Sequence, residues 1–341
     1  MPQFRKNPIT NGWRIISTER SKRPADFRLK NSEVLSPSEN CPFEPGNEEM
    51  TPGEIFSYVN PEGSGSKWWI RGFPAKSPVL RIEGEVKHFG LNIFDKVTGI
   101  GAHEIIVESP DHNDCFSKMD TNQIEKVFWA YRDRIIDLKR DKRFRYILIF
   151  KNHGPRAGSH IDHPHSQVIA LPVTPKKIKE ELEGARFHYS MKERCIFCDI
   201  IDQESKLKER VIMETKHFIA LAPWAPRFPF ETWILPKEHS HDFTALSKSQ
   251  AMDLALLFKR FFRALIKILK SSVNYNLILH DTPNLIPQKG YWDSIEKDFH
   301  WHFEVIPRIK DIAGFEWGTG FYINSLPPEF AAEELRKVIY E

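Results

Sequence analysis

His163-Pro164-His165-Ser166-Gln167-Val168-Ile169-Ala170-Leu171 is the stretch that decides the fold of this chain. The apolar run after the histidines predicts a buried β-strand, and in a strand every second side chain shares one face. His163, His165 and Gln167 are therefore expected to project together as catalytic groups. A neutral imidazole is nucleophilic, and the ordinary histidine pKa of ~6.5 leaves it largely neutral at physiological pH. The spacing predicts that one histidine attacks while the other holds a metal, and a pair that only binds metal is the alternative.

Length, charge and hydropathy narrow the class of protein. The chain has 341 residues, enough for two domains or one duplicated unit. Its 49 basic and 46 acidic residues leave a net charge of +3, so the composition gives no case for a nucleic-acid partner. No stretch has the continuous apolar length of a membrane span, and no signal peptide is visible. A soluble protein without a membrane partner is expected.

The cysteine content indicates the redox compartment. The chain has four cysteines, and two of them form the motif Cys195-Ile196-Phe197-Cys198. In a histidine-rich chain this spacing favours metal binding over a disulfide. We therefore expect a reducing, cytoplasmic location.

Two halves of the chain carry the same landmarks in the same order. Each half has a cysteine motif, an apolar β-like run, a histidine, a helix that begins at a capping box, a second β-like run and a closing H-x-H motif. In the first half these are Cys41-Pro42-Phe43-Glu44, 103–109, His112, a helix from Asp120 with Gln123, 146–150 and 163–165. In the second half they are 195–198, 231–236, His239, a helix from Ser247 with Gln250, 275–279 and 300–302. The apolar stripes expected on the two helices are Ile124, Val127, Phe128, Tyr131, Ile135 and Leu138, and Leu254, Leu257, Phe258, Phe261, Leu265 and Leu269.

These repeated landmarks predict an internal duplication with a boundary between Gly184 and Arg194. We expect an N-terminal domain over 1–185 that carries the H-x-H-x-Q motif and a C-terminal domain over 186–341 that carries the C-x-x-C motif. Short connections between strands and one long helix per half favour an α+β fold. Its sheets should be mostly antiparallel, with the helices packed on one face.

Each half also has the residue types of a metal site. Cys195 and Cys198 have the spacing with which two thiolates bind one tetrahedral zinc, and His239 and His300 are the candidates that complete the set. Two ordinary buried thiols are the alternative reading of this pair.

The equivalent residues in the first half are Cys41, Glu44, His112 and His163. A carboxylate is a harder ligand than a thiolate, so this site is expected to bind zinc more weakly, to bind another divalent metal or to be empty. In each case it would be structural and would hold His163 so that His165 is correctly aimed.

In combination, several motifs resemble the galactose-1-phosphate uridylyltransferase family of the histidine-triad superfamily. The resemblance covers nearly the whole chain, and its motifs are Asn7-Pro8-Ile9-Thr10 with Trp13, Arg20-Ser21-Lys22-Arg23-Pro24, Cys41-Pro42-Phe43, Glu108-Ser109-Pro110-Asp111-His112, 163–167, Gly314-Phe315-Glu316 and 318–324. It implies a duplicated histidine-triad-like fold, a homodimer and a double-displacement enzyme. In this reaction His165 would take a nucleoside monophosphate from a nucleotide sugar and pass it to a phosphate-bearing acceptor.

The resemblance also assigns substrate contacts. Arg20 and Arg23 match a pair that faces the phosphates, while Lys310, Phe315 and Glu316 lie in the part that contacts the hexose. Asn152 and Gly158 are expected to line the phosphate loop, and Gln167 to donate to the phosphoryl oxygens, because transfer at phosphorus depends on positioned donors. His280 matches a ligand of a second metal site in some members, with His239 as a competitor for that role, and His302 is a further candidate.

Three departures from the family pattern bear on the substrate. In the loop Gly158-Ser159-His160, a histidine replaces the usual phosphate-binding serine. Ala75-Lys76 stands where an asparagine commonly contacts the ribose, and Tyr322 replaces a galactose-contacting glutamine. These changes leave three functions open. A hexose-1-phosphate uridylyltransferase is favoured, an adenylyltransferase acting on ADP-glucose or adenylylsulfate with phosphate as acceptor is the alternative, and a nucleotide-binding or hydrolysing sensor is a reading from another class.

Overall fold

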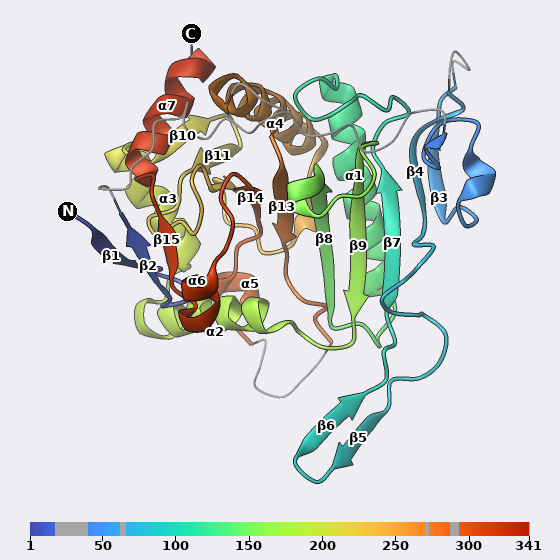
Figure 1. Ribbon diagram of the computed structural model, residues 1–341. Helices are drawn as coiled ribbons and strands as arrows, with labels where there is room; N and C mark the ends of the chain where they lie inside the picture. The colour runs from blue at the N-terminus through green and yellow to red at the C-terminus, as the bar shows by residue number, and fades with distance from the viewer. Residues whose placement is uncertain (18–39, 62–65, 270–272, 287–292, 341) are drawn as a thin grey trace.

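A single ten-stranded antiparallel sheet forms the centre of the computed structural model, which describes residues 1–17, 40–61, 66–269, 273–286 and 293–340 (Figure 1). Its strands, in sheet order, are Val211–Glu214 (β10), Phe218–Leu221 (β11), Thr232–Pro236 (β12), His302–Pro307 (β14), Tyr275–His280 (β13), Tyr146–His153 (β8), His165–Leu171 (β9), Ala102–Val107 (β7), Trp68–Pro74 (β4) and Phe56–Val59 (β3). Every neighbouring pair is antiparallel, as the sequence predicts.

The strand order has the symmetry of a duplicated unit. The order β3-β4-β7-β9-β8 in the first half is repeated as β10-β11-β12-β14-β13 in the second half. The two halves join where β8 pairs with β13, with Phe150 opposite Ile278. As a result β9 corresponds to β14, and each of these strands begins at the second histidine of an H-x-H motif.

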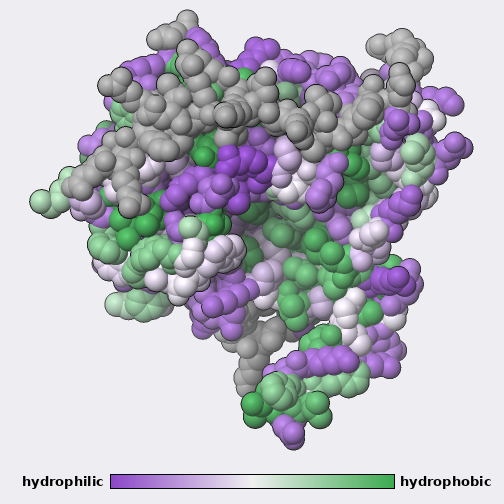
Figure 2. Space-filling view, viewed as in Figure 1, coloured by the Kyte–Doolittle hydropathy of each residue, from purple (hydrophilic) through white to green (hydrophobic). Residues whose placement is uncertain are grey.

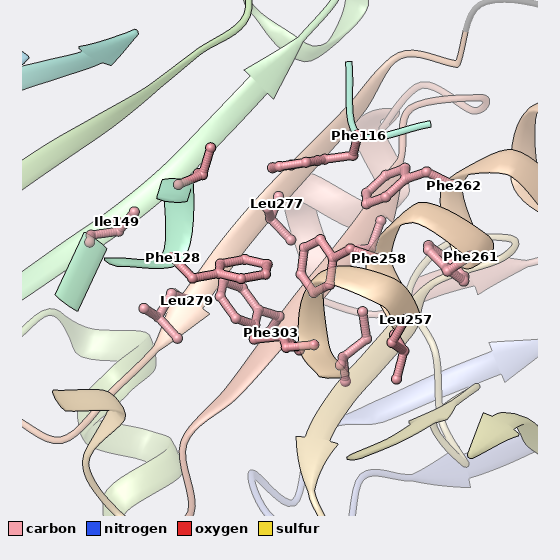
Figure 3. Packing of buried hydrophobic residues seen from close by; sticks show 14 of the residues in the cluster. Phe116, Phe128, Ile149, Leu257, Phe258, Phe261, Phe262, Leu277, Leu279 and Phe303 are labelled. Carbon is pink, nitrogen blue, oxygen red and sulfur yellow. The ribbon is translucent and has the colours of Figure 1, made fainter. Parts of the chain in front are cut away.

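Two long helices, one from each half, pack together on one face of the sheet. They are Thr121–Lys139 (α1) and Lys248–Leu269 (α4), and every residue of the two expected apolar stripes is buried in one core cluster. Figure 3 shows its aromatic centre, where the Phe258 ring lies 4.9 Å from the Phe128 ring and 5.1 Å from the Phe303 ring, both edge-on. The last helix, Pro328–Tyr340 (α7), packs against α4.

The two capping boxes differ. Ser247 and Gln250 form the complete box, since each side chain accepts a hydrogen bond from the backbone N–H of the other residue. At α1 the Asp120 side chain accepts from Gln123 N–H at 2.8 Å, but the Gln123 amide donates to the carbonyls of Trp69 and Glu108 instead of turning back. The predicted box is therefore half formed at α1, because tertiary partners take the second side chain.

The expectation that the helices lie on one face is wrong. Helices Lys176–Lys192 (α2), Ile196–Leu207 (α3) and Ile295–Asp298 (α5) belong to the opposite face. There Ile178, Leu182 and Phe197 share a second core cluster with Trp233 and Leu235 of β12. Both faces of a strand such as β12 are apolar and need cover, so a second helical layer is required. The expected boundary at residues 185 and 186 lies inside α2.

Smaller elements complete the molecule. Strands Gln3–Lys6 (β1), Trp13–Ile16 (β2) and Tyr322–Asn324 (β15) form a three-stranded sheet beside helix Gly314–Thr319 (α6). Strands His88–Leu91 (β5) and Phe94–Val97 (β6) form a hairpin that projects from the body of the molecule, and Figure 2 shows hydrophobic side chains gathered on it. Short 3-10 helices cover Glu48–Met50, Pro155–Ala157 and Phe243–Ala245. Within the described residues, no helix has the length and apolar character that a membrane crossing needs.

Candidate active site and metal-ligand groups

His165 is the first residue of β9, and one of its ring nitrogens is held by the backbone. Its Nδ1 lies 2.8 Å from the carbonyl oxygen of His163, so Nδ1 carries the proton and donates it. This hydrogen bond leaves the Nε2 lone pair available for attack. The strand begins later than the spacing predicts, because His163 precedes β9 rather than lying in it.

The surroundings of His165 keep the imidazole neutral. Burial, and secondly the charge of Lys151, lower the pKa of His165 to about 4. The Phe43 ring packs edge-on against the imidazole, with 5.2 Å between centroids. A neutral ring held by packing and by one hydrogen bond has the state that a nucleophile needs.

The predicted neutrality has a direct consequence for pH dependence. We expect the rate at which His165 is nucleotidylated to stay level as the pH falls from 8 to 5.5, and to decline only towards pH 4, because protonation removes the Nε2 lone pair. Single-turnover labelling in a quench-flow apparatus, read by intact-protein mass spectrometry, measures this profile. A midpoint near ~6.5, the value of an unperturbed histidine, would contradict the proposed environment.

A buried ion pair supports the strand beneath this histidine. Lys151 Nζ lies 2.6 Å from Glu108 Oε2, and both side chains are almost completely buried. The same ammonium group donates to the carbonyl of His165 at 3.1 Å, while Glu108 Oε1 accepts from Tyr131 and Ser166. Every charge is therefore compensated, which is the condition under which a buried pair is tolerated. Lys151 was not identified from the sequence, because the apolar residues before it, 146–150, predict a buried strand and give no sign of a buried charge.

Gln167 is oriented by another residue that was not identified from the sequence. Its Oε1 lies 3.0 Å from His103 Nε2, and the backbone N–H of Val79 lies 3.3 Å from His103 Nδ1. His103 therefore donates from Nε2 to Gln167, which leaves the Gln167 amide N–H groups free to donate. Ala75 N–H donates to the carbonyl of His103 at 2.8 Å, so Ala75 and the exposed Lys76 lie beside this pair. The sequence of residues 103–109 predicts a strand that includes His103. Only the pairing of β7 with β9 shows that Gln167 is the partner of His103.

The expected phosphate-contacting residues between β8 and His165 are Asn152, near the end of β8, and Gly158, Ser159 and His160 in the loop that follows. Asn152 accepts a hydrogen bond from Asn276 Nδ2 at 2.8 Å, and Gly158 has φ of +90°, a conformation that favours glycine. The Ser159 hydroxyl donates to the carbonyl of Ile161 at 2.8 Å, and His160 is exposed. The other expected phosphate contacts, Arg20 and Arg23, lie outside the described residues.

Cys41, Glu44, His112 and His163 converge on one point, with their ligand atoms within 4.8 Å of one another. His163 Nε2 donates to the carbonyl of Ser109 at 2.7 Å, so its Nδ1 faces the carboxylate of Glu44. His112 Nδ1 lies 2.8 Å and His163 Nδ1 lies 3.6 Å from Glu44 Oε1, and these three buried atoms make no hydrogen bond with the described residues. Unsatisfied acceptors that face one another are what a bound cation would compensate, so this donor set fits a divalent metal.

The second group, Cys195, Cys198, His239 and His300, has the same arrangement. Both histidine Nδ1 atoms face Cys198 Sγ, at 3.4 Å for His239 and 3.7 Å for His300. Their Nε2 atoms donate to the carbonyls of Glu296 and Pro236, which determines the tautomer that a metal ligand requires. The Cys195 side chain and then the two histidines lower the pKa of Cys198, so a thiolate is available. This donor set fits tetrahedral zinc.

A third group contains Glu181, His280 and His302. Glu181 Oε2 lies 2.8 Å from His280 Nδ1, and Glu181 Oε1 lies 3.2 Å from His302 Nε2. The group is separate from His239, so His239 and His280 do not compete for one metal. Glu181 was not identified from the sequence, because it lies on α2 without a neighbouring histidine or cysteine motif.

The expected hexose-contacting residues lie on or beside α6 and β15, near the end of the chain. Lys310 Nζ donates to Glu316 Oε1 at 3.0 Å and to the carbonyl of Ile323 at 2.7 Å. Phe315 is exposed, and Tyr322 packs against Phe228. In Figure 1 these residues, on or beside α6 and β15, lie towards the second-half strands, while β9 and β7 lie on the other side of the molecule. One chain therefore does not bring the two sets together.

Comparisons with known proteins agree with this architecture. Residues 1–175 match the model of the galactose-1-phosphate uridyl transferase N-terminal domain, and residues 181–338 match that of its C-terminal domain. The chain therefore belongs to the galactose-1-phosphate uridylyltransferase family, and it is a nucleotidyltransferase.

Individual relatives carry two different names. ADP-glucose phosphorylase from Arabidopsis thaliana is 34% identical over 342 residues, covering 99% of this chain and 93% of that protein. Galactose-1-phosphate uridylyltransferase from Thermotoga maritima is 30% identical over 349 residues, covering 100% of both chains. A crystal structure of the Arabidopsis ADP-glucose phosphorylase with bound ADP-glucose superposes with a TM-score of 0.82 at 31% identity over 99% of each chain.

Proposed function

We propose that this chain transfers a nucleoside monophosphate through a covalent bond between phosphorus and His165 Nε2. The observation that carries the proposal is the buried, neutral imidazole whose Nδ1–H is held by the carbonyl of His163. The relatives carry two names, galactose-1-phosphate uridylyltransferase and ADP-glucose phosphorylase, and both kinds of activity are compatible with transfer of a nucleoside monophosphate.

The reaction has two displacements. His165 Nε2 attacks the α-phosphorus of a nucleotide sugar, and the bond from phosphorus to the bridging oxygen breaks so that the sugar 1-phosphate leaves. A phosphate oxygen of the acceptor then attacks the same phosphorus, the phosphorus–nitrogen bond breaks, and the imidazole is regenerated. Throughout, the proton on Nδ1 stays on His165, and the carbonyl of His163 stabilises the positive charge of the substituted ring. Gln167 donates to the phosphoryl oxygens through the amide group that His103 orients.

For the substrate, we propose a hexose-1-phosphate uridylyltransferase of galactose metabolism that takes UDP-glucose as donor and galactose 1-phosphate as acceptor. The second candidate is adenylyl transfer from ADP-glucose or adenylylsulfate to phosphate. It is favoured by the ADP-glucose phosphorylase relative and by Ala75, whose methyl group offers no hydrogen bond where the family commonly has an asparagine.

Mass spectrometry distinguishes the two candidates, because the mass of the adduct identifies the base. Incubation with UDP-glucose, ADP-glucose or adenylylsulfate at equal concentration is expected to label His165, and the donor that labels it fastest identifies the substrate. The adenylyl candidate predicts that His160→Ser lowers the rate for its donor, with loss of a hydrogen bond costing about 0.5–1.5 kcal/mol. If UDP-glucose labels at least as fast as the other donors and His160→Ser changes no rate, adenylyl specificity is refuted.

We further propose a homodimer in which Lys310 and Glu316 of the partner subunit complete the acceptor site beside His165. The separation of these residues within one chain supports this arrangement. The hairpin β5–β6 exposes Leu91, Ile93 and Phe94, with exposed fractions of 71%, 88% and 66%, and such a surface favours an interface.

Subunit mixing tests this arrangement. His165→Asn and Lys310→Met proteins are each expected to be inactive in full turnover. A refolded equimolar mixture of the two should regain roughly a quarter of wild-type turnover, because about half of its dimers are hybrids and each hybrid has one intact site of two. Turnover is measured after unfolding and refolding the mixture. No recovery, with hybrid dimers verified by native mass spectrometry, would contradict a shared site.

The Cys195, Cys198, His239 and His300 group is proposed to hold a structural zinc. Cys41, Glu44, His112 and His163 are proposed to hold zinc or another divalent metal that supports the position of His163. The four cysteines are free, which supports a reducing cytoplasmic location.

A further inference from the structure

Glu108, the residue after β7, is linked to three consecutive residues around the proposed nucleophile. Its backbone N–H donates to the carbonyl of Pro164 at 2.9 Å, and its carboxylate accepts from the Ser166 hydroxyl. The same carboxylate lies 2.6 Å from Lys151 Nζ, and this ammonium group donates to the carbonyl of His165 at 3.1 Å. One side chain and its ion-pair partner therefore hold the backbone on both sides of the His165 ring.

Helix α1 holds Glu108 in turn. The Gln123 side chain, in the first turn of α1, donates to the carbonyl of Glu108 at 2.7 Å. Further along the same helix, the Tyr131 hydroxyl donates to Glu108 Oε1 at 3.0 Å. The side chains of Glu108 and Lys151 are 0% and 1% exposed, so solvent does not compete for these hydrogen bonds. The network is therefore a rigid connection from α1 to the start of β9.

The second half of the chain builds the same pair of strands with apolar residues at these positions. In the first half the second residue of β9 is Ser166, and the register of β8 and β9 places Lys151 opposite it. The equivalent pair in the second half is Phe303, the second residue of β14, and its partner Leu279 in β13. Both lie in the main core cluster. An apolar pair therefore satisfies the fold here, whereas the charged pair, whose burial costs desolvation, lies in the half with the proposed nucleophile.

We propose that Glu108 and Lys151 are positioning residues, which fix the backbone of His165 so that Nε2 meets the phosphorus in line. The role rests on the proposed transfer through His165. Both side chains are too deeply buried to contact a substrate, so they act through the hydrogen bond from Lys151 to the His165 carbonyl. The bond from His165 Nδ1 to the carbonyl of His163 orients the ring only relative to its own segment. The ion pair connects that segment to β7 and β8.

The charge-balanced variant Glu108→Gln/Lys151→Met tests this role. Neutral side chains of similar size often replace a buried ion pair without loss of the fold, so this protein is expected to fold. Single-turnover labelling at pH 8, with varied UDP-glucose and in parallel with varied ADP-glucose, gives the limiting rate and the dissociation constant of the donor. We expect the limiting rate to fall about 100-fold, the cost of a misplacement of roughly 1 Å, with an unchanged dissociation constant and complete final labelling.

A second buried ion pair provides the matched control. Arg210 and Glu204 lie 2.9 Å apart and have side chains 3% and 5% exposed. They join α3 to the residue before β10, and strands β11, β12, β14, β13 and β8 separate β10 from β9 in the sheet. Glu204→Gln/Arg210→Met is therefore expected to label His165 at the wild-type limiting rate.

Ser166→Ala is the second test variant, and it decides the question if Glu108→Gln/Lys151→Met does not fold. It removes only the hydroxyl that donates to Glu108, so we expect a smaller fall in the same limiting rate. Circular dichroism and thermal unfolding show whether each variant is folded.

The readouts separate positioning from a structural role. A slower limiting rate in the test variant, with the wild-type rate in the control pair, supports positioning. An unchanged limiting rate in the folded test variant overturns it, whatever happens to donor affinity or to the labelled fraction, and so does equal slowing in the control pair. A wild-type protein that takes no label from either donor refutes the proposed function, and the positioning role falls with it.

Discussion

Replacement of His165 by asparagine is expected to abolish the nucleotidyl adduct and to lower turnover by at least ~10⁴-fold, because the covalent route loses its proposed nucleophile. His302 cannot substitute, since its Nε2 faces Glu181. Intact-protein mass spectrometry after incubation with the nucleotide sugar measures the adduct, and initial rates measure turnover.

Two further observations make this result specific. The wild-type enzyme should show parallel initial-rate lines of ping-pong kinetics, and His165→Gly should regain part of its activity when imidazole is added. The matched control is His217→Gly, at a histidine that lies beside Ser249 and belongs to none of the expected site residues; this variant should still form the adduct. Intersecting lines that require a ternary complex would refute the covalent mechanism.

Replacement of Cys198 by serine is expected to remove one zinc ion per chain and to lower the melting temperature by ~10 °C or more, because metal-binding energy in a structural site is also folding energy. Cys198 Sγ is the atom towards which both histidine Nδ1 atoms point, so its loss disrupts the whole ligand set. Elemental analysis and thermal unfolding give the two measurements.

Cys115→Ser provides the control for this experiment. Cys115 lies beside Ser117 Oγ and belongs to none of the three candidate metal groups in the described part of the chain. Its replacement should change neither the zinc content nor the melting temperature. An unchanged zinc content in Cys198→Ser would show that this group does not hold the metal.

Local sequence determined most of the secondary structure and the class of enzyme. The spacing of the stripe on α4 predicts its buried face, since side-chain direction in a helix repeats every 3.6 residues whatever the neighbours are. The H-x-H-x-Q motif likewise predicts His165 as the proposed nucleophile, and the hydrogen bond that orients its ring runs to a carbonyl only two residues away. Such features depend on contacts within a few residues, and the sequence contains them directly.

The partners that tune the site were decided only by the tertiary structure. His103 orients Gln167 because β7 pairs with β9, and Lys151 meets Glu108 in the core although neither residue type is expected there. Glu181 joins His280 and His302 because α2 packs against the opposite half of the sheet. Strand order and register determine such contacts, and these depend on the packing of the whole sheet rather than on local periodicity.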